Sequence, residues 1–190
     1  MTTIVTTTGP NYSTIVADRG VTSDLMHPDR LKIVQQGSWL ISVTGTARDC
    51  DLYQYAVKYP KPTPALLKKP TEEWAGWMVL NVVPLIKEQL NPEPEKNPEF
   101  NAEAILVTHG RSFHIGSLFD VQIAEPFWAI GSGSHLALGT LATFQYEDNW
   151  YKNHDLMAKR AIENAEMFDP FTRGSIDVYI SHKQGNIDKA

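Results

Sequence analysis

The sequence has almost no cysteine, which excludes a disulfide-stabilised fold. Cys50 is the single cysteine among 190 residues, so a reducing compartment is expected. A lone thiol can be a nucleophile, but Cys50 lies within residues 47–57, a half-apolar stretch with helical periodicity. Buried cysteines in such stretches mostly behave as small apolar residues. We therefore expect Cys50 to pack rather than to react.

The sequence also lacks the segments that direct a protein to a membrane. The first residues show no basic stretch followed by an apolar one, as a secretory signal peptide would have. The longest apolar stretch, residues 74–86, is interrupted by Asn81 and Pro84 and is shorter than the roughly 20 residues that a membrane helix needs. We expect a soluble, cytoplasmic protein with no membrane partner.

Neither sign of charge dominates, so the composition indicates no charged partner. The 17 Lys and Arg residues and 22 Asp and Glu residues give a formal net charge of -5, which provides no attraction for nucleic acid.

Hydrophobic residues make up 42% of the chain, enough for one packed core. The chain has no internal repeat or linker-like stretch. Residues 1–190 are therefore expected to form a single domain, with a polar tail at 182–190.

The residue patterns that are present predict an α+β fold. Extended or alternating segments predict strands at 2–8, 12–17, 31–35, 39–44, 104–108, 112–115, 121–123, 127–130 and 175–180. Apolar residues with helical spacing predict helices at 47–57, 71–90, 134–143 and 154–167. Thr71 is expected to cap the second helix and Pro84 to bend it. Because strands in hairpins are separated by paired helices, the order favours α+β over alternating βαβ units.

Thr2 is the first candidate for a catalytic residue. Removal of Met1 would leave a hydroxyl and a free α-amine on this one residue. Such an amine has a pKa of about 7.7–8.0, so part of it is neutral near physiological pH and can act as a general base for the hydroxyl. Many proteins begin with Met-Thr, however, so this feature alone identifies nothing.

Motifs along most of the chain resemble those of one enzyme family. Thr2–Val5 and Lys32–Ile33 fall where the β-type subunits of proteasomes and the bacterial peptidase HslV have their N-terminal threonine and catalytic lysine. Further motifs resemble the family's Asp-Ser-Arg-Ala-Thr, Ala-Gly-Gly-Ala-Ala-Asp-Cys, Gly-Ser-Gly and Asp-Ala-Tyr-Ser-Gly-Gly segments: Ala17–Thr22, Thr44–Cys50, Ile130–Ser134 and Asp169–Gly174. Each motif is short and, taken alone, is not specific. The specificity of the resemblance comes from the order and spacing of all the motifs together.

The resemblance implies a catalytic centre around Thr2. Thr2 would be the nucleophile, and its α-amine would be the base. Lys32 would place a cation beside the hydroxyl, which favours deprotonation of the hydroxyl and disfavours protonation of the amine. Asp18 would pair with Lys32, and the Gly45 N–H would face the oxyanion of the tetrahedral intermediate.

The same resemblance implies a supporting network and substrate contacts. Ser132, Asp169 and Thr172 would surround the Thr2 amine, with Thr172 in place of the serine that is usual in the family. An extended peptide would bind as an added edge strand. The residues expected to contact it are Thr22, Val43 and Ala47.

At the level of the whole molecule, the resemblance implies a four-layer αββα sandwich of the N-terminal nucleophile hydrolase type. Such subunits form homo-oligomeric stacked rings that enclose the active sites. The expected activity is threonine-type endopeptidase hydrolysis of unfolded polypeptides or peptides, with an ATPase unfoldase as a further partner. No cofactor and no metal are required for this chemistry.

Two other functions fit the same motifs. The chain could be a non-proteolytic N-terminal nucleophile amidohydrolase that acts on a small amide, or a catalytically silent ring or scaffold subunit. The presence of Thr2, Asp18, Lys32 and Gly45 together argues against the silent subunit.

Two unrelated site classes are disfavoured. Residues 131–133, Gly-Ser-Gly, suggest a dinucleotide-binding loop, but Leu136 occupies the third glycine position and no βαβ unit surrounds it. His109 and His114 do not have the spacing of zinc ligands.

Overall fold

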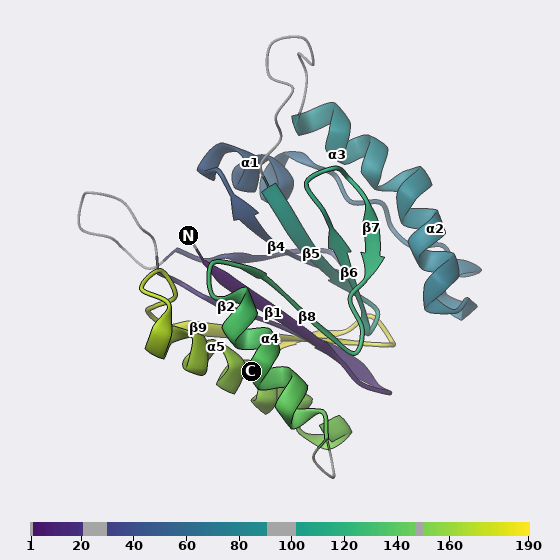
Figure 1. Cartoon of the computed structure of the whole chain (residues 1–190). Coiled ribbons are helices and arrows are strands. Elements are labelled where there is room, and N and C mark those ends of the chain that lie inside the picture. Colours follow the sequence, from purple (N-terminus) through teal and green to yellow (C-terminus); the bar gives the residue numbers. More distant parts are fainter. Residues whose placement is uncertain (1, 21–29, 91–101, 147–149) are drawn as a thin grey trace.

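The structure is a computed structural model that describes residues 2–20, 30–90, 102–146 and 150–190. Two antiparallel sheets lie face to face between two layers of helices (Figure 1). This arrangement confirms the expected α+β class and the four-layer αββα sandwich.

Each sheet has five strands. The first has the order β10-β9-β2-β1-β8. Its strands are β1 (Thr3–Thr8), β2 (Tyr12–Asp18), β8 (Phe127–Gly131), β9 (Ile176–His182) and β10 (Ile187–Lys189). The second has the order β3-β4-β5-β6-β7. Its strands are β3 (Ile33–Gln36), β4 (Trp39–Gly45), β5 (Ala102–Thr108), β6 (Arg111–Ile115) and β7 (Val121–Ile123).

A helix layer covers the outer face of each sheet (Figure 1). The first sheet packs against α4 (Ser134–Phe144) and α5 (His154–Phe168), which follow one another through the short 3-10 helix η3 (Trp150–Lys152). The layer over the second sheet consists of α1 (Ala47–Asp51), the π-helical η1 (Leu52–Ala56), the 3-10 helix η2 (Leu66–Lys68), α2 (Thr71–Asn81) and α3 (Val83–Leu90).

Alternating side chains in the first sheet fill two separate cores. Val5 and Val16 are paired across β1 and β2 and contact the α4 and α5 side. Ile4 and Ile15 point the other way, into the core between the two sheets. Side chains along a strand alternate between its two faces, so consecutive residues of β1 belong to different layers. By the same alternation, the side chains of the neighbouring residues Thr2 and Thr3 point to opposite faces of the first sheet.

Several sequence predictions need correction. Thr71 is not an N-cap: Pro70 occupies that position without a side-chain hydrogen bond, and Thr71 is the first residue of α2. The predicted helix is interrupted at Val82 instead of bending at Pro84. A proline disfavours helical geometry just before itself and lacks an N–H donor, which explains a break shortly ahead of it. The expected polar tail contains β10, which pairs with β9.

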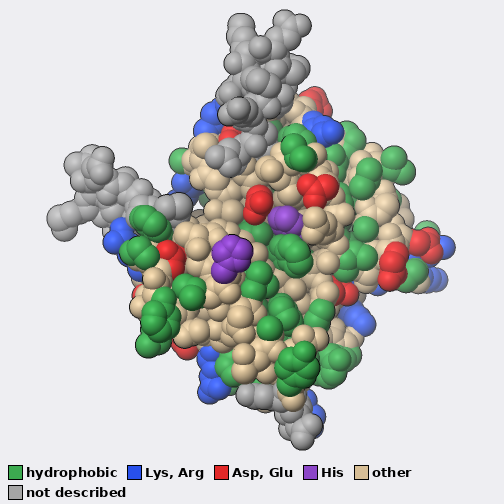
Figure 2. Space-filling model, in the orientation of Figure 1, with side chains coloured by type: hydrophobic (Ala, Val, Ile, Leu, Met, Phe, Trp, Pro, Cys, Tyr) green, Lys and Arg blue, Asp and Glu red, His purple; other side chains and the backbone are tan. Residues whose placement is uncertain are grey.

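The surface retains large hydrophobic side chains on the layer formed by α4 and α5. Leu136, Leu156, Met167 and Phe168 are all exposed. On the face shown in Figure 2, hydrophobic side chains are interspersed with charged ones. Within the described parts of the chain, no helix is long and apolar enough to cross a membrane.

Candidate active site

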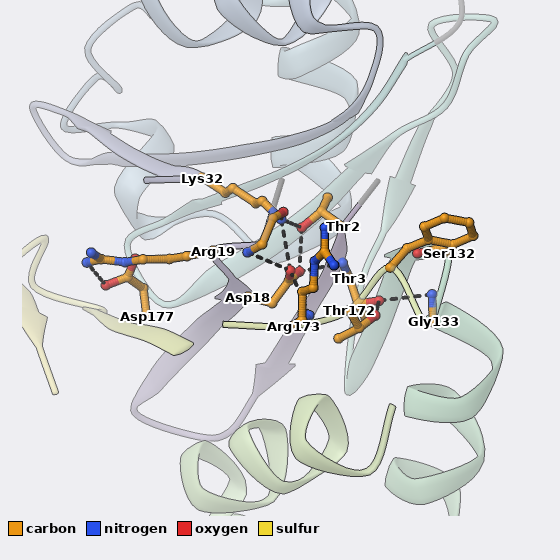
Figure 3. A network of polar contacts seen from close by, with 12 residues as sticks. Thr2, Thr3, Asp18, Arg19, Lys32, Ser132, Gly133, Thr172, Arg173 and Asp177 are labelled. Carbon is orange, nitrogen blue, oxygen red and sulfur yellow. Dashed lines mark hydrogen bonds and ion pairs between the residues drawn. The ribbon is translucent and has the colours of Figure 1, made fainter. Parts of the chain in front are cut away.

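Thr2, Asp18 and Lys32 meet at one end of the first sheet (Figure 3). The Thr2 hydroxyl donates to Asp18 Oδ1 at 2.5 Å, and Lys32 Nζ donates to Thr2 Oγ1 at 2.6 Å. Lys32 Nζ also lies 2.9 Å from Asp18 Oδ2. The hydroxyl is therefore oriented from both sides, by a cation and by a carboxylate.

The Lys32 ammonium is fully occupied by acceptors. Besides Thr2 Oγ1 and Asp18 Oδ2, it donates to the Gly20 carbonyl oxygen at 2.5 Å. An ammonium has three N–H donors, and each has an acceptor here, which favours the charged form. Burial lowers the pKa of Lys32, and the neighbouring Asp18 carboxylate opposes this shift. The site thus holds a cation whose pKa is below that of a free lysine.

Asp18 is held by the main chain as well as by these side chains. Its Oδ1 accepts the Thr3 N–H at 2.8 Å, and its Oδ2 accepts the N–H groups of Gly20 at 3.1 Å and Arg173 at 3.3 Å. The side chain is only 1% exposed, so these bonds replace the water that an ionised carboxylate needs. The carboxylate is fixed before any substrate binds.

The end of β2 is anchored by an ion pair that the sequence analysis did not identify. Arg19 donates two hydrogen bonds to Asp177 on β9, at 2.6 and 2.7 Å, and Lys189 on β10 lies 3.1 Å from the same carboxylate. Burial raises the pKa of Asp177, but the hydrogen bonds from Arg19 and Lys189 outweigh it and the net shift is downward. The Arg19–Asp177 pair is shown in Figure 3. Arg19 directly precedes Gly20, so the pair anchors the main chain next to the carbonyl that accepts from Lys32.

A second polar cluster forms around Thr3, on the opposite face of β1. The Gly133 N–H donates to Thr3 Oγ1 at 2.9 Å, Thr3 and Thr172 share a hydrogen bond of 2.5 Å, and Thr172 donates to Asp169 at 2.6 Å. A hydroxyl has one proton, so with Thr172 donating to Asp169, Thr3 must donate to Thr172. The bonds therefore run in one direction, from Gly133 to the Asp169 carboxylate.

Ser132 joins this cluster and connects it to Thr2. Its hydroxyl donates to Asp169 Oδ2 at 2.6 Å, and its N–H donates to the Thr2 carbonyl at 3.0 Å. Burial favours the neutral acid at Asp169, but the hydrogen bonds from Ser132 and Thr172 outweigh it and lower the pKa. The structure thus brings the predicted Ser132, Asp169 and Thr172 together, and links them to Thr2 through the main chain.

Gly131 allows the close approach of β8 to the start of β1. Its φ is +95°, and a Cβ added there would lie 1.9 Å from the Thr2 carbonyl oxygen. A side chain at this position would displace Thr2, and the backbone conformation also favours glycine. Glycine is therefore required where Thr2 and Ser132 meet.

A pocket of about 190 Å³ opens beside the Thr2 hydroxyl. The predicted residues Val43, Gly45 and Ala47 line it together with Thr2 and Lys32. Gly45 ends β4 with a φ of +144°. The structure therefore places Val43, Gly45 and Ala47 in the lining of one pocket with Thr2, whereas Thr22 lies outside the described residues.

Cys50 also lines the pocket and keeps its expected character as a packed thiol. It is half-buried, and its Sγ donates to the Val43 carbonyl at 3.5 Å. Burial raises the pKa of the thiol to about 11, so it stays protonated at neutral pH.

Gln54 is a pocket residue that the sequence analysis missed. It lies on η1, is 2% exposed, and donates from Nε2 to the Lys32 carbonyl at 2.7 Å. Ala47, Cys50 and Gln54 are spaced by three and four positions, which on a helix places them on one side. The spacing of Gln54 from Ala47 and Cys50 was the only signal in the sequence, because its burial is seen only in the structure.

Across the described ranges, no group of three or more His, Cys, Asp and Glu side chains could hold a metal ion. The Gly-Ser-Gly loop begins at the end of β8, which pairs antiparallel with β1. It therefore does not belong to a βαβ unit, which a dinucleotide-binding loop requires.

Sequence comparison finds no matching protein-family model and no matching curated protein. Comparison of the structure does find solved proteins with the same fold. Thiobacillus denitrificans BPH in complex with epoxomicin matches with a TM-score of 0.71 at 16% identity, over 95% of this chain and 98% of that one. Eukaryotic HslV from Trypanosoma brucei matches with a TM-score of 0.68 at 19% identity, over 95% and 99%. A second structure of Thiobacillus denitrificans BPH has a TM-score of 0.66 at 18% identity, over 95% and 97%.

Proposed function

We propose that this chain is a threonine-type endopeptidase that uses Thr2 as an N-terminal nucleophile after removal of Met1. The observation that carries the proposal is the Thr2 hydroxyl held between Lys32 Nζ and Asp18 Oδ1, at the wall of a pocket. The fold shared with HslV and BPH supports this assignment.

In the proposed reaction, Thr2 Oγ1 attacks the carbonyl carbon of the peptide bond. The free α-amine of Thr2 takes the hydroxyl proton and later gives it to the leaving amine. Lys32 stabilises negative charge that develops on Oγ1 and, as a neighbouring cation, disfavours early protonation of the amine. Asp18 keeps Lys32 in place.

The tetrahedral intermediate needs a hydrogen-bond donor for its oxyanion. Gly45 lies in the pocket lining next to Thr2, and we assign its N–H to this role. Collapse of the intermediate breaks the C–N bond and leaves an ester on Thr2 Oγ1. Water then attacks this ester, with the same amine as the base, and restores the hydroxyl.

The supporting cluster has a positioning role in this proposal. Ser132 holds the Thr2 carbonyl through its N–H, and Asp169 accepts hydrogen bonds from Ser132 and Thr172. These contacts fix the main chain of Thr2, from which the α-amine projects. A fixed amine and hydroxyl reduce the entropic cost of reaching the transition state.

The direct test begins with mass spectrometry of the N-terminus, which should show loss of Met1. The processed protein should hydrolyse fluorogenic peptides and gain the mass of epoxomicin, the compound in the BPH complex. Thr2→Ala should reduce peptide hydrolysis by more than about 10³-fold and abolish labelling, because it removes the attacking oxygen. Thr2→Ser, which keeps a hydroxyl, is the matched control and should retain both.

The outcomes separate the competing functions. Labelling without peptide cleavage, together with turnover of small amides, would assign the chain to the amidohydrolases. A processed protein with neither labelling nor turnover would assign it to the silent subunits. Peptide cleavage at the parent rate by Thr2→Ala would refute the nucleophile.

We also propose a homo-oligomeric ring that acts in the cytoplasm on unfolded polypeptides. The exposed Leu136, Leu156, Met167 and Phe168 on α4 and α5 support burial of this layer in an assembly. Native mass spectrometry should give a discrete oligomer, and a monomer would contradict it. An ATPase unfoldase is part of the proposal, tested by whether such a partner accelerates degradation of a folded substrate more than that of a short peptide.

A further inference from the structure

Gly20 contacts both members of the ion pair that orients the Thr2 hydroxyl. Its carbonyl oxygen accepts from Lys32 Nζ at 2.5 Å, and its N–H donates to Asp18 Oδ2 at 3.1 Å. The same N–H also donates to the Arg173 carbonyl at 2.7 Å. The Lys32 side chain is buried, so water does not readily replace the Gly20 carbonyl if this part of the main chain moves. The position of Gly20 therefore bears directly on the charge of Lys32.

Gly20 lies two residues beyond the end of β2, where strand pairing stops. The register of β2 with β9 ends with Asp18 opposite Ile176. Beyond this pair, the Arg19 N–H donates to the Ser175 carbonyl at 2.9 Å. Main chain that leaves a sheet has fewer hydrogen bonds to fix it, so side-chain contacts contribute more to its position. Arg19 supplies such a contact.

The Arg19 side chain extends away from Thr2 and binds Asp177 on β9 (Figure 3). The two hydrogen bonds measure 2.6 and 2.7 Å, and the Asp177 side chain is only 4% exposed. A bidentate pair between a guanidinium and a carboxylate fixes orientation as well as distance. Asp177 is opposite Ala17 in the pairing of β9 with β2, so its own main chain is held within the sheet. Asp177 is therefore a fixed point from which Arg19 can hold Gly20.

Lys189 on β10 binds the same carboxylate from the other neighbouring strand. Its Nζ lies 3.1 Å from Asp177 Oδ1, and its side chain is half-exposed. A buried carboxylate that loses every partner strongly destabilises a fold. A variant that lacks the Arg19 guanidinium is expected to fold, because Lys189 still pairs with Asp177.

From these contacts we propose that Asp177 is a positioning residue for the reaction: it holds Arg19, which keeps the Gly20 carbonyl against the Lys32 ammonium. This inference rests on the proposed peptidase function and goes beyond it. It extends the catalytic assembly to β9, a strand that contains none of the residues predicted for the site. The effect of Asp177 on the chemistry passes through the main chain of residues 19–20.

The charge of Lys32 can be followed through the alkaline limb of kcat/KM. Titratable side chains face Lys32 from three of the elements around it: Asp18 on β2, Arg30 ahead of β3 and Cys50 on α1. Processing adds the Thr2 α-amine to these groups. If Gly20 moves, the ammonium loses one of its three acceptors while Asp18 stays in place. The neutral form is then favoured, and the alkaline limb moves to lower pH.

The experiment measures kcat/KM against pH with one fluorogenic peptide for the processed parent, Asp177→Asn and Arg19→Met. Loss of either partner releases Gly20, so the alkaline limb should move to lower pH by about 0.5–1 unit in both variants. At neutral pH, kcat should fall by roughly 5–20-fold with KM nearly unchanged, because the loss acts on the reacting hydroxyl. The position of the limb is independent of the active fraction.

Arg19→Met separates positioning from a direct effect of charge. Loss of a cation by itself would favour the Lys32 ammonium and move the limb to higher pH, opposite to the positioning effect. Loss of the Asp177 charge would move the limb to lower pH in either case. The double variant should show the shift of either single variant, because both break the same contact, whereas two opposite charge effects would cancel. If Asp177→Asn does not fold, Arg19→Met carries the test alone.

Asp188→Asn is the matched control. Asp188 lies on β10, next to Lys189, and its exposed carboxylate pairs with His182 at 2.8 Å. The change removes one negative charge from the same edge of the sheet and leaves the Arg19–Asp177 pair in place. The alkaline limb should stay within about 0.2 unit of the parent, since exposed ion pairs contribute little. A shift equal to that of Asp177→Asn would contradict the proposal.

The outcomes distinguish this inference from the function on which it rests. A limb that stays in place in Asp177→Asn, or moves to higher pH in Arg19→Met, would overturn the role of Asp177 and leave the peptidase intact. If the processed parent neither cleaves peptides nor is labelled by epoxomicin, the peptidase function itself fails. The positioning is then tested without turnover by NMR titration of ¹³C-labelled lysine, with Lys32→Met to assign the signal. The pKa of Lys32 should be lower in both variants than in the parent, and an equal pKa would overturn the inference.

Discussion

The two polar clusters at the start of β1 differ in how they use charge. Around Thr2, the Lys32 cation and the Asp18 carboxylate contact the same hydroxyl. Around Thr3, neutral donors from Gly133 onward converge on the single Asp169 carboxylate. Thr2 thus belongs to a network suited to stabilising charge on its hydroxyl, and Thr3 belongs to a network suited to fixing the position of the main chain. Removing a member of the first should mainly affect rate, and removing a member of the second should affect stability as well.

The largest effect is expected for Lys32→Met, which removes the cation and keeps a side chain of similar length. We expect kcat/KM to fall by about 10²–10³-fold or more, since a preorganised charge at the reacting oxygen is lost. Lys69, half-exposed and paired with Glu73, provides the control. Lys69→Met should change kcat/KM less than about 2-fold, because exposed ion pairs contribute little. Similar losses in both variants would contradict a specific role for Lys32.

A smaller loss is expected from Thr3→Val, which deletes one hydroxyl at nearly constant shape. The Gly133 N–H then lacks its acceptor, so the free energy of unfolding should fall by about 1–3 kcal/mol. Activity should drop by roughly 10-fold through displacement of Thr2. Thr143→Val, at an exposed site on α4, is the control and should stay within about 0.5 kcal/mol in chemical denaturation. Full stability in Thr3→Val would show that the hydroxyl chain is dispensable.

The pH profile sharpens the comparison, because only the first cluster contains a lysine. Lys32 is charged below its pKa, so its contribution to activity should be lost as pH rises through that pKa. Burial lowers the pKa from 10.5, so the alkaline limb of kcat/KM should lie below that value. Asp18→Asn removes the carboxylate that favours the ammonium and should move the limb to lower pH. In Asp169→Asn the limb should stay in place; movement in both variants would mean that the two clusters titrate together.

The smallest effect is expected at Thr172, where the resemblance predicts serine. Thr172→Ser keeps the hydroxyl that donates to Asp169, so activity should change by less than about 2–3-fold. Thr172→Val removes that hydroxyl while keeping the branched shape, and should resemble Thr3→Val in both activity and stability. If the serine variant is as impaired as the valine variant, the methyl group is the part that matters.

Much of the fold follows from local sequence patterns. The hairpins formed by β1–β2, β3–β4 and β5–β6 were predicted because extended segments flank short turns at residues 9–11, 36–38 and 109–111. The helix break at Val82 and the strand β10 were not predicted. The break depends on how Pro84 is accommodated in the packed helix, and β10 depends on an available edge of β9. Neither is encoded by the periodicity of one segment.

The candidate site, like the fold, was predicted from the sequence only in part. Thr2, Asp18 and Lys32 were predicted from the resemblance, and the structure brings them together, although their roles remain proposals. Thr3 and Gln54 were missed because their partners come from distant parts of the chain. Thr3 meets Thr172 only through the pairing of β1 with β8 and the loop after α5, and Gln54 reaches Lys32 from a π-helical turn that sequence periodicity does not predict.

The contact between Gly131 and the Thr2 carbonyl provides a criterion for recognising functional relatives. Overall identity to the solved proteins of this fold is only 16–19%, which is too low to sort them by sequence. A chain can hold its second residue against β8 in this way only if the last residue of that strand has no side chain. We therefore expect glycine there, together with Thr2 and Lys32, in chains that use the proposed N-terminal nucleophile.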